Sequence, residues 1–404
     1  MSGSTSADPR FALDLVRMRR ERHDKLQAAM AEQGLDALVL LTSGNVLYST
    51  GVRAVLTDTA RTYQQRAIGV VLVGAPFPFL FSPFPDGAPP ELPADHLLPA
   101  LWPETDEGVE DMGRRLKSLF GGQDVRRVGY DDATAPMHLG LPALLAPAEL
   151  VDCTGLLTQA RLFKTPDELE CMRRSWAVNE AANHAAEEVL RPGARLTDLS
   201  AAYYRRLFDE GAVCNFLDPV FQAMPVNIAD GPWSTNGDVP FNLVTTDHIL
   251  RDGDVVWTDT VMGYEGYASD VGRTWVVGEP SPRLAELYER WQAITDAVID
   301  RIGPGVTGAE LTKVATDLNG GTKPWLAHFF LAHGLGLEGG EPQHIGSDKG
   351  PEYDEQFVLQ PGMAIVVEPV TWEDGHCGWR CEELLFVTDD GHELVSRYRN
   401  APFQ

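Results

Sequence analysis

The chain has 404 residues, which is too many for one small core, and this length predicts two or three domains. Its 59 acidic and 33 basic residues give a formal net charge of -26. Such a field repels phosphate backbones and anionic lipid surfaces, so the composition argues against nucleic-acid and membrane binding.

Neither a secretion signal nor a membrane span is expected. The first ten residues are polar, and the most apolar early run, from Ile68, is short and interrupted by proline. The five cysteines are an odd number without compact spacing, which predicts reduced thiols and a cytoplasmic protein. Cys377 and Cys381 have no second cysteine pair beside them, so ordinary packing is favoured over a zinc site.

The N-terminal part alternates helical and strand patterns. A charged amphipathic helix is expected to end at Gly34. Apolar runs that read as strands, the last two around a helix, follow at 37–41, 67–73, 125–132 and 148–157. This alternation predicts a small α/β domain over residues 1–157, and it leaves residues 158–404 for a second domain.

The second domain is expected to contain an internal duplication. A helix that starts with Pro166 leads to a Pro-Gly turn at Pro192, and a helix from about Pro282 leads to a similar turn at Pro304. Thr165 with Glu168, and Thr307 with Glu310, fit capping boxes in the two copies. In both copies an acidic residue follows the turn proline by 78 residues, namely Asp270 and Glu382.

Two pairs of acids lie in apolar, strand-like runs. Asp259 and Asp270 are equidistant from the point between Tyr264 and Glu265, so we expect them to face each other across a hairpin, with Cβ atoms roughly 5 Å apart. Glu368 and Glu382 are likewise equidistant from Gly375. A single acid on a strand ordinarily faces solvent, but opposed like charges are destabilising unless they are neutralised.

Metal binding is the interpretation that these pairs favour. Four carboxylates balance two divalent cations, and His333, just before a glycine-rich turn, is a candidate fifth ligand. Oxygen donors with one imidazole suit Mn²⁺, Co²⁺, Fe²⁺ or Zn²⁺.

The chain resembles the M24 group of prolidase, aminopeptidase P and creatinase. The resemblance covers nearly the whole chain and is carried by "GLDALVLLTSGNVLYSTG", "RLFKTPDELECMRRS", "YASDVGRTW", "HGLGLE", "PGMAIVVEP" and "WRCEELLFVTDDG". It implies an α+β fold, in which a small creatinase-like α/β domain precedes a C-terminal pita-bread domain. That domain is a curved antiparallel sheet with outer helices and an internal pseudo-twofold duplication. Members of the group often dimerise, so a homodimer is expected.

The resemblance also implies roles for individual residues. The ligands of two divalent ions would be Asp259, Asp270, His333, Glu368 and Glu382. Asp270 and Glu382 would bridge the ions, and Glu368 would act as general base towards water. Arg380 is expected either to bind a substrate carboxylate or to balance the charge of the acidic cluster.

The sequence departs from the peptidases of this group at two histidines. Seventeen or eighteen residues before the first metal aspartate it has Asn242 and Phe241, and seven residues after the metal histidine it has Gly340. Each missing donor is worth about 3 kcal/mol of transition-state stabilisation. His328 and His344 are candidate replacements, although on a strand the odd offset of His328 from His333 turns it away unless a bulge intervenes. Asn242 and His344 are expected to contact substrate.

Three functions follow from these observations. The leading prediction is an Xaa-Pro peptidase type of hydrolase that acts on a small peptide or amide; if nothing replaces the missing histidines, Xaa-Pro dipeptides should be poor substrates. The alternative is a metal-dependent lyase that performs β-elimination, like the dimethylsulfoniopropionate lyase of this fold. The acids expected of that lyase would fall near Thr258 and Gly339, with Glu338 and Glu341 close by. The third is a non-catalytic binding protein.

Overall fold

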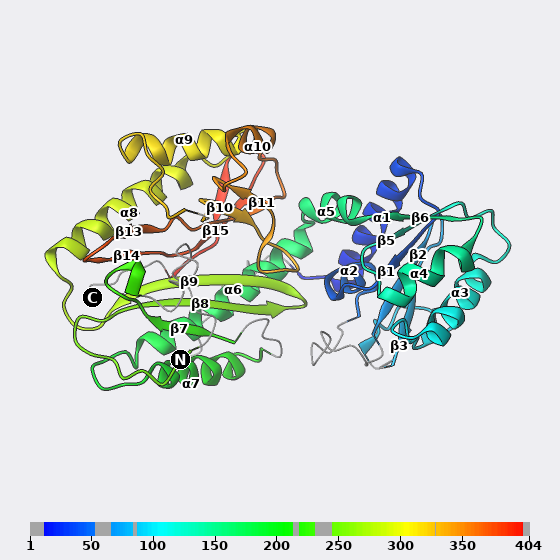
Figure 1. Ribbon diagram of the computed structural model, residues 1–404, viewed down its shortest axis with the longest axis horizontal. Coiled ribbons are helices and arrows are strands. Elements are labelled where there is room, and N and C mark those ends of the chain that lie inside the picture. The colour runs from blue at the N-terminus through cyan, green and yellow to red at the C-terminus, as the bar shows by residue number, and fades with distance from the viewer. Residues whose placement is uncertain are drawn as a thin grey trace. The chain divides into compact units, whose positions relative to one another are not determined.

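A computed structural model describes residues 12–52, 66–83, 87–212, 218–230, 245–327 and 329–398, which form two compact units (Figure 1). The first unit spans Asp14–Asp167, and the second begins at Glu168. None of the helices in the described ranges is long and apolar enough to cross a bilayer.

The first unit is a six-stranded mixed sheet with helices, in the strand order β4-β3-β2-β1-β5-β6. Its elements are α1 (Leu15–Gln33), β1 (Ala37–Leu40), α2 (Ser43–Thr50), β2 (Ile68–Leu72), β3 (Phe79–Ser82), β4 (Leu97–Pro99), α3 (Asp106–Phe120), β5 (Arg127–Tyr130), α4 (Ala135–Leu145), β6 (Glu149–Asp152) and α5 (Thr154–Leu162).

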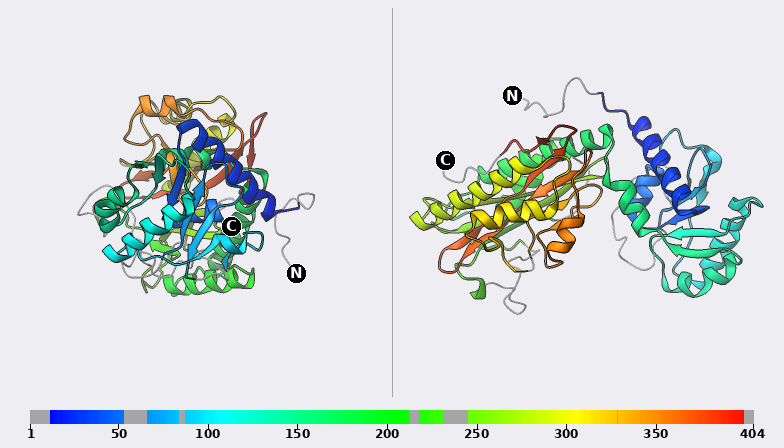
Figure 2. Two further views of the ribbon diagram at one scale, coloured as in Figure 1. Left: turned by 90° about the vertical axis from the view of Figure 1, so that its right-hand side faces the viewer. Right: turned by 90° about the horizontal axis from the view of Figure 1, so that it is seen from above.

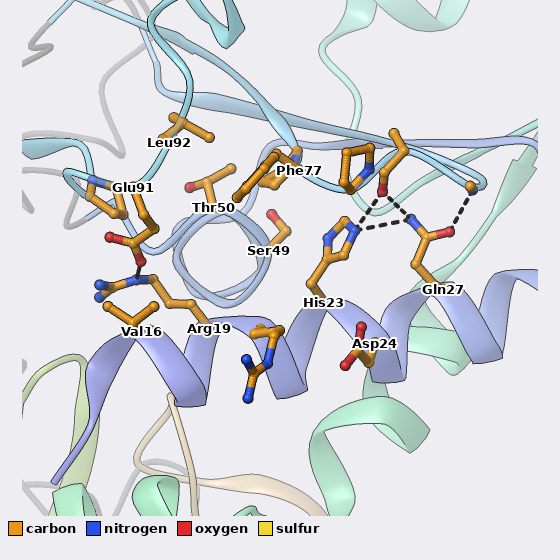
Figure 3. Close-up of a pocket in the computed structure, with 16 residues that line it drawn as sticks. Val16, Arg19, His23, Asp24, Gln27, Ser49, Thr50, Phe77, Glu91 and Leu92 are labelled. Carbon is orange, nitrogen blue, oxygen red and sulfur yellow. Dashed lines mark hydrogen bonds and ion pairs between the residues drawn. The ribbon is translucent and has the colours of Figure 1, made fainter.

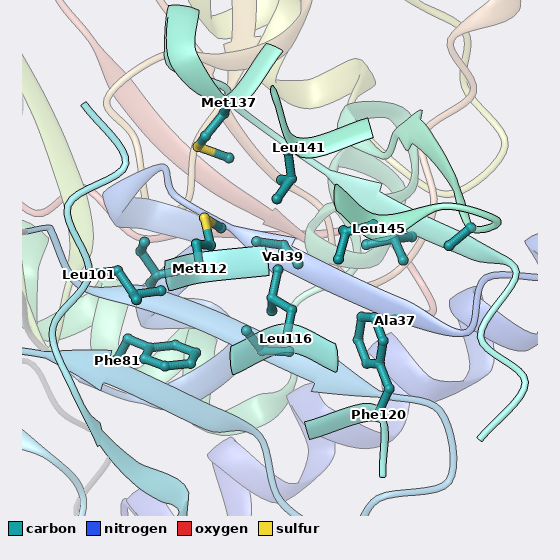
Figure 4. Close-up of a cluster of buried hydrophobic side chains, with 14 of the residues drawn as sticks. Ala37, Val39, Phe81, Leu101, Met112, Leu116, Phe120, Met137, Leu141 and Leu145 are labelled. Carbon is teal, nitrogen blue, oxygen red and sulfur yellow. The ribbon is translucent and has the colours of Figure 1, made fainter. Parts of the chain in front are cut away.

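The core of this unit lies between one face of the sheet and helices α3 and α4. Val39 of β1 and Phe81 of β3 are buried in one cluster with Met112 of α3 and Leu141 of α4 (Figure 4). Each of the four predicted strand runs contains a strand, and α1 ends at Gly34, which adopts the left-handed conformation that favours glycine (φ 64°).

Helix α5 belongs to the first unit. The Tyr48 hydroxyl of α2 donates a hydrogen bond to the Ala160 carbonyl of α5 (3.0 Å). The expected boundary after residue 157 falls inside this helix, and the structure divides the chain between Asp167 and Glu168 instead. The run 148–157 is strand only as far as Asp152, because its second half forms α5.

The second unit contains two helix pairs, each followed by antiparallel strands. Its elements are α6 (Pro166–Glu187), α7 (Leu196–Asp209), β7 (Val220–Ala223), β8 (Val255–Tyr264), β9 (Tyr267–Val276), α8 (Pro282–Arg301), α9 (Gly308–Leu318), β10 (Ala332–Gly334), β11 (Glu341–Ile345), α10 (Pro351–Gln356), β12 (Ala364–Val367), β13 (Thr371–Glu373), β14 (Cys377–Trp379), β15 (Glu383–Val387) and β16 (His392–Leu394).

The strands of the second unit lie between the two helix pairs. Figure 1 shows α7 on one side of them and α8 and α9 on the other, and α6 packs with α7 against β7, β8 and β9. The view from above in Figure 2 shows α8 and α9 side by side. The predicted capping box of α9 is present: the Glu310 amide donates to the Thr307 hydroxyl (3.2 Å), and the Thr307 amide donates to the Glu310 carboxylate (2.9 Å).

The strands form three hydrogen-bonded groups, β7-β8-β9, β11-β10-β12-β15-β16 and β13-β14. Two further backbone hydrogen bonds join the first group to the second half: Ala268 donates to Gly336 (2.7 Å), and Glu382 donates to Gly272 (3.1 Å). The predicted duplication therefore brings the acidic segments of its two halves edge to edge.

Candidate metal centre

The β8–β9 hairpin carries Asp259 and Asp270, but they are not direct partners. Asp259 pairs with Gly272, and Asp270 pairs with Val261. The prediction that the two aspartates face each other is therefore wrong. They are diagonal neighbours on the same face of the hairpin, because strand positions two apart point the same way.

The turn between the two strands decides this register. It consists of Glu265 and Gly266, whose φ angles of 50° and 86° are both positive, as a type I′ turn requires. The centre of the hairpin therefore lies between these two residues, one position later than the symmetry of the two aspartates suggested.

Glu368 and Glu382 do stand at opposite positions, as predicted. The residue pairs on either side of them, in β12–β15 and in β13–β14, share one centre at Gly375. Both carboxylates are buried, with 2 % and 0 % of the residue surface exposed.

Gly272 gives Glu382 access to the aspartates. A Cβ atom at Gly272 would lie 2.9 Å from Glu382 Oε1 and 2.8 Å from Arg380 Nη1, so only glycine leaves room for both side chains. One carboxylate oxygen each from Asp259, Asp270 and Glu382 lie within 4.8 Å of one another. This role of Gly272 was not predicted, although a glycine inside the strand run "SDVGRTW" is a signal for such a close approach.

His333 of β10 completes the cluster. Its Nε2 lies 3.2 Å from Glu368 Oε1 and 3.8 Å from Asp270 Oδ2. Its Nδ1 lies 2.7 Å from the Gly334 carbonyl, which only accepts, so Nδ1 carries the proton and Nε2 presents its lone pair to the cluster. The structure thus brings all five predicted ligands together.

The charges of the cluster favour a bound cation. Burial, with the nearby Glu382 carboxylate as the next cause, raises the pKa of Asp270 well above its usual range. Burial also raises the pKa of Glu382 well above its usual range, against the effect of Arg380. Asp259 Oδ1 and Glu382 Oε2 are buried and have no hydrogen-bond partner among the described residues. Four carboxylates and one imidazole with unsatisfied oxygens fit divalent metal ions.

Glu368 differs from the other acids because it is held in the ionised form. Burial would raise its pKa, but the Arg380 guanidinium outweighs this and lowers the pKa to about 2. Arg380 donates to Glu368 Oε2 from Nη2 (2.8 Å) and from Nε (3.1 Å). Arg380 Nη2 also contacts Glu382 and lies 3.4 Å from Asp259 Oδ2. Of the two roles expected for Arg380, this arrangement supports the counter-ion.

His344 of β11 lies next to the metal cluster. Its ring stacks on that of His333, with centroids 6.0 Å apart, and Phe330 packs edge-on against it at 4.8 Å. A Cβ atom at Gly340 would lie 3.9 Å from His344 Nε2. The His344 imidazole therefore lies beside the open space left by the absent side chain at Gly340. Asn242, Phe241 and His328 lie outside the described residues.

The model of the metallopeptidase family M24 matches residues 170–389, which contain all five residues of the cluster. The chain belongs to this family. The model of the creatinase/prolidase N-terminal domain matches residues 22–163. Membership places the chain among the metal-dependent hydrolases and implies divalent metal ions.

Several relatives are similar over almost the whole chain. A protein named probable dipeptidase PepE from Mycobacterium tuberculosis is 28% identical over 382 residues, which are 91% of this chain and 94% of the relative. A protein named Xaa-Pro dipeptidase from Lactobacillus delbrueckii is 26% identical over 381 residues, with the same coverage.

Solved structures show the same fold. The prolidase from Pyrococcus horikoshii is 20% identical, covers 95% of this chain and 100% of its own, and has a TM-score of 0.74. Dipeptidase PepE from Mycobacterium ulcerans is 23% identical, covers 97% and 99%, and also has a TM-score of 0.74. The expected α+β fold, a creatinase-type domain followed by a pita-bread domain, is thereby confirmed.

Proposed function

We propose that this M24 member is a dinuclear metal-dependent hydrolase of the Xaa-Pro peptidase type that acts on a small peptide or amide. The observation that carries the proposal is the convergence of Asp259, Asp270, His333, Glu368 and Glu382 in one largely buried cluster. The printed names of the relatives, dipeptidase and Xaa-Pro dipeptidase, support the same substrate class.

The side chains of the cluster would have different roles in hydrolysis. When bound, two divalent ions would lower the pKa of a water molecule and polarise the scissile carbonyl. Asp270 and Glu382, one from each half of the duplication, would bridge the ions. Arg380 lowers the pKa of Glu368, so this carboxyl is ionised at neutral pH and would accept a proton from that water.

Arg380 acts in this proposal as a positioning residue. Its two hydrogen bonds to one oxygen of Glu368 hold that carboxylate in place, and Nη1 also donates to the Thr258 carbonyl (3.3 Å). Its guanidinium is therefore engaged with the protein itself, which makes a substrate carboxylate the less supported partner.

We propose that His344 replaces the imidazole missing at Gly340. It lies beside the space that the missing side chain would fill, and its stacking on His333 places it at the edge of the metal cluster. Burial lowers the pKa of His344, so the ring is neutral at neutral pH and would donate one hydrogen bond without carrying a charge.

The lyase alternative gains no supporting observation. Thr258 donates from its hydroxyl to Asn183 of α6 (3.3 Å), so it faces away from the cluster. Gly339 has no side chain, and a Cβ atom there would lie 3.6 Å from Asp270 Oδ2.

The deciding experiment measures bound metal per chain and then the products from three substrate classes. We expect two divalent ions per chain and metal-dependent cleavage of Xaa-Pro dipeptides or N-acyl amino acids. Elimination products from sulfonium acids, without amide cleavage, would establish the lyase instead. A metal-free protein that cleaves none of these would support the non-catalytic binding protein. The cytoplasm is proposed as its location because Cys153, Cys377 and Cys381 are free thiols, and a homodimer stays a prediction.

A further inference from the structure

The first unit contains a cavity of about 600 Å³ that has no part in the metal cluster (Figure 3). It is lined by one side of α1, the end of α2, the segment after β2 and the segment from Pro89 to Leu92. None of the five cluster residues lines it. Its volume suits a small organic molecule.

Much of the wall is apolar and rigid. The segment after β2 contributes Pro76, Phe77 and Pro78, and the wall is extended by Pro89 and Leu92. Proline has a fixed φ and no amide hydrogen, so this wall offers little conformational freedom and few hydrogen-bond donors. Phe77 exposes 38 % of its surface, which leaves its ring available to a flat apolar ligand.

Two side chains of this wall have a buried polar atom without a hydrogen-bond partner among the described residues, namely His23 (Nδ1) and Glu91 (Oε2). The other oxygen of Glu91 is paired with Arg19, so His23 offers the neutral acceptor. The residue is buried, and its Nε2 lies 2.8 Å from the Ala75 carbonyl, which only accepts, so Nε2 carries the proton and donates. Nδ1 is buried and has no hydrogen-bond partner within the described part of the chain. Figure 3 shows this second nitrogen on the side of the ring that faces Ser49. A buried acceptor without a partner is destabilising, and a ligand donor would satisfy it.

The imidazole is held in this orientation by its surroundings. Gln27 donates to the Leu72 carbonyl (2.9 Å), and its side-chain oxygen accepts from the Gly74 amide (2.7 Å). These bonds fix the segment that carries Ala75, the partner of His23 Nε2. The acceptor at Nδ1 is therefore pre-organised, which reduces the entropic cost of binding.

The charges around the cavity cancel. Arg19 and Arg20 are matched by Asp24 and Glu91, and Arg19 pairs directly with Glu91. A strongly charged ligand would gain little from such a balanced rim, whereas a neutral ligand keeps the existing ion pair.

We propose that this cavity is a binding site for a small, neutral, mainly apolar molecule whose single N–H or O–H group donates a hydrogen bond to His23 Nδ1. The flat body of the ligand packs on Phe77 and the neighbouring prolines. The proposal does not depend on the reaction at the metal cluster.

Isothermal titration of the full chain with indole and with benzofuran tests the hydrogen bond. The two probes have nearly the same shape, but only indole has an N–H group. We expect one saturable site per chain. Indole should bind about five- to tenfold more tightly than benzofuran, which is the effect of one neutral hydrogen bond. Equal affinities, or no saturable binding of indole in the millimolar range, would overturn the proposal.

Variants then locate the site. His23→Leu should abolish the preference for indole while benzofuran still binds. If that variant does not fold, Phe77→Ala, a change at a partly exposed side chain, should weaken both probes several-fold. Trp102→Ala is the matched control, because Trp102 is 44 % exposed and does not line the cavity. Unchanged binding in Phe77→Ala, or lost binding in Asp270→Asn, would refute a site in this cavity.

Discussion

Replacing Asp270 with asparagine is expected to change the stability of the protein in opposite directions with and without metal. Without metal, the substitution removes a negative charge from a cluster of buried carboxylates. With metal, it removes the ligand proposed to bridge the two ions. The metal-free protein should therefore become more stable, and the stabilisation that metal provides should become smaller.

The magnitude follows from the geometry of the cluster. Oxygens of Asp259, Asp270 and Glu382 lie within 4.8 Å of one another. At this distance two unit charges repel by about 3.5 kcal/mol at an effective dielectric constant of about 20. Protonating an ordinary aspartate at pH 7 costs about 4 kcal/mol, which is less than the repulsion from two neighbouring carboxylates. Protonation of Asp270 therefore limits how much its charge can destabilise the metal-free protein. Arg380 offsets part of this, and we expect a gain of about 1–3 kcal/mol.

Urea unfolding after dialysis against a chelator, repeated with added Mn²⁺, measures both effects, and elemental analysis measures bound metal. Asp300→Asn is the matched control, since Asp300 is an exposed acid of α8. It should change neither the free energy of unfolding nor the metal content. The reasoning fails if metal-free Asp270→Asn is less stable than the unchanged protein, or if its metal content is unaltered.

Three further predictions address other parts of the centre. Gly272→Ala should displace Glu382 and Arg380 and lower metal content and kcat at least about tenfold. The control is Gly155→Ala, where a Cβ meets nothing within 4 Å, and it should leave both quantities unchanged. Normal metal content in Gly272→Ala would contradict this prediction. His344→Ala should lower kcat by roughly 10²-fold at constant metal content. Adding Gly340→His to this variant should restore part of the lost kcat. Full activity of His344→Ala alone would show that another group donates the hydrogen bond to the substrate. Metal binding should release protons, because burial raises the pKa of Glu382 and the proton on this carboxyl competes with metal. Metal affinity should therefore rise with pH through the acid range. Calorimetry in buffers of different ionisation enthalpy measures the proton release.

Much of the architecture was predictable from local patterns. Gly34 ends α1, Pro282 begins α8 and Thr307 with Glu310 caps α9, because each of these signals depends on backbone geometry within one turn of the chain. The equal spacing of the two halves and the resemblance to M24 members identified the five ligands. Position in the sequence was sufficient for this, since each ligand lies in its own recognisable motif.

The register of the β8–β9 hairpin and the residue that replaces the missing histidine, by contrast, depended on three-dimensional contacts. The symmetry of the two aspartates predicted a hairpin centre that the type I′ turn at Glu265 and Gly266 shifts by one residue. The sequence offered His328 and His344 as replacement imidazoles without deciding between them. The structure places His344 beside the space at Gly340, and His328 lies outside the described residues.

The sequence by itself determined the two-unit organisation, the duplicated frame and the identity of the acids, because these follow from residue type and spacing. Only the tertiary structure decided which acids meet and how they are held. The hydrogen bond from Glu382 to the Gly272 carbonyl joins strands that are more than a hundred residues apart, and no local pattern encodes that contact. Arg380 of the second half reaches Asp259 of the first half only because this joint brings the two halves together.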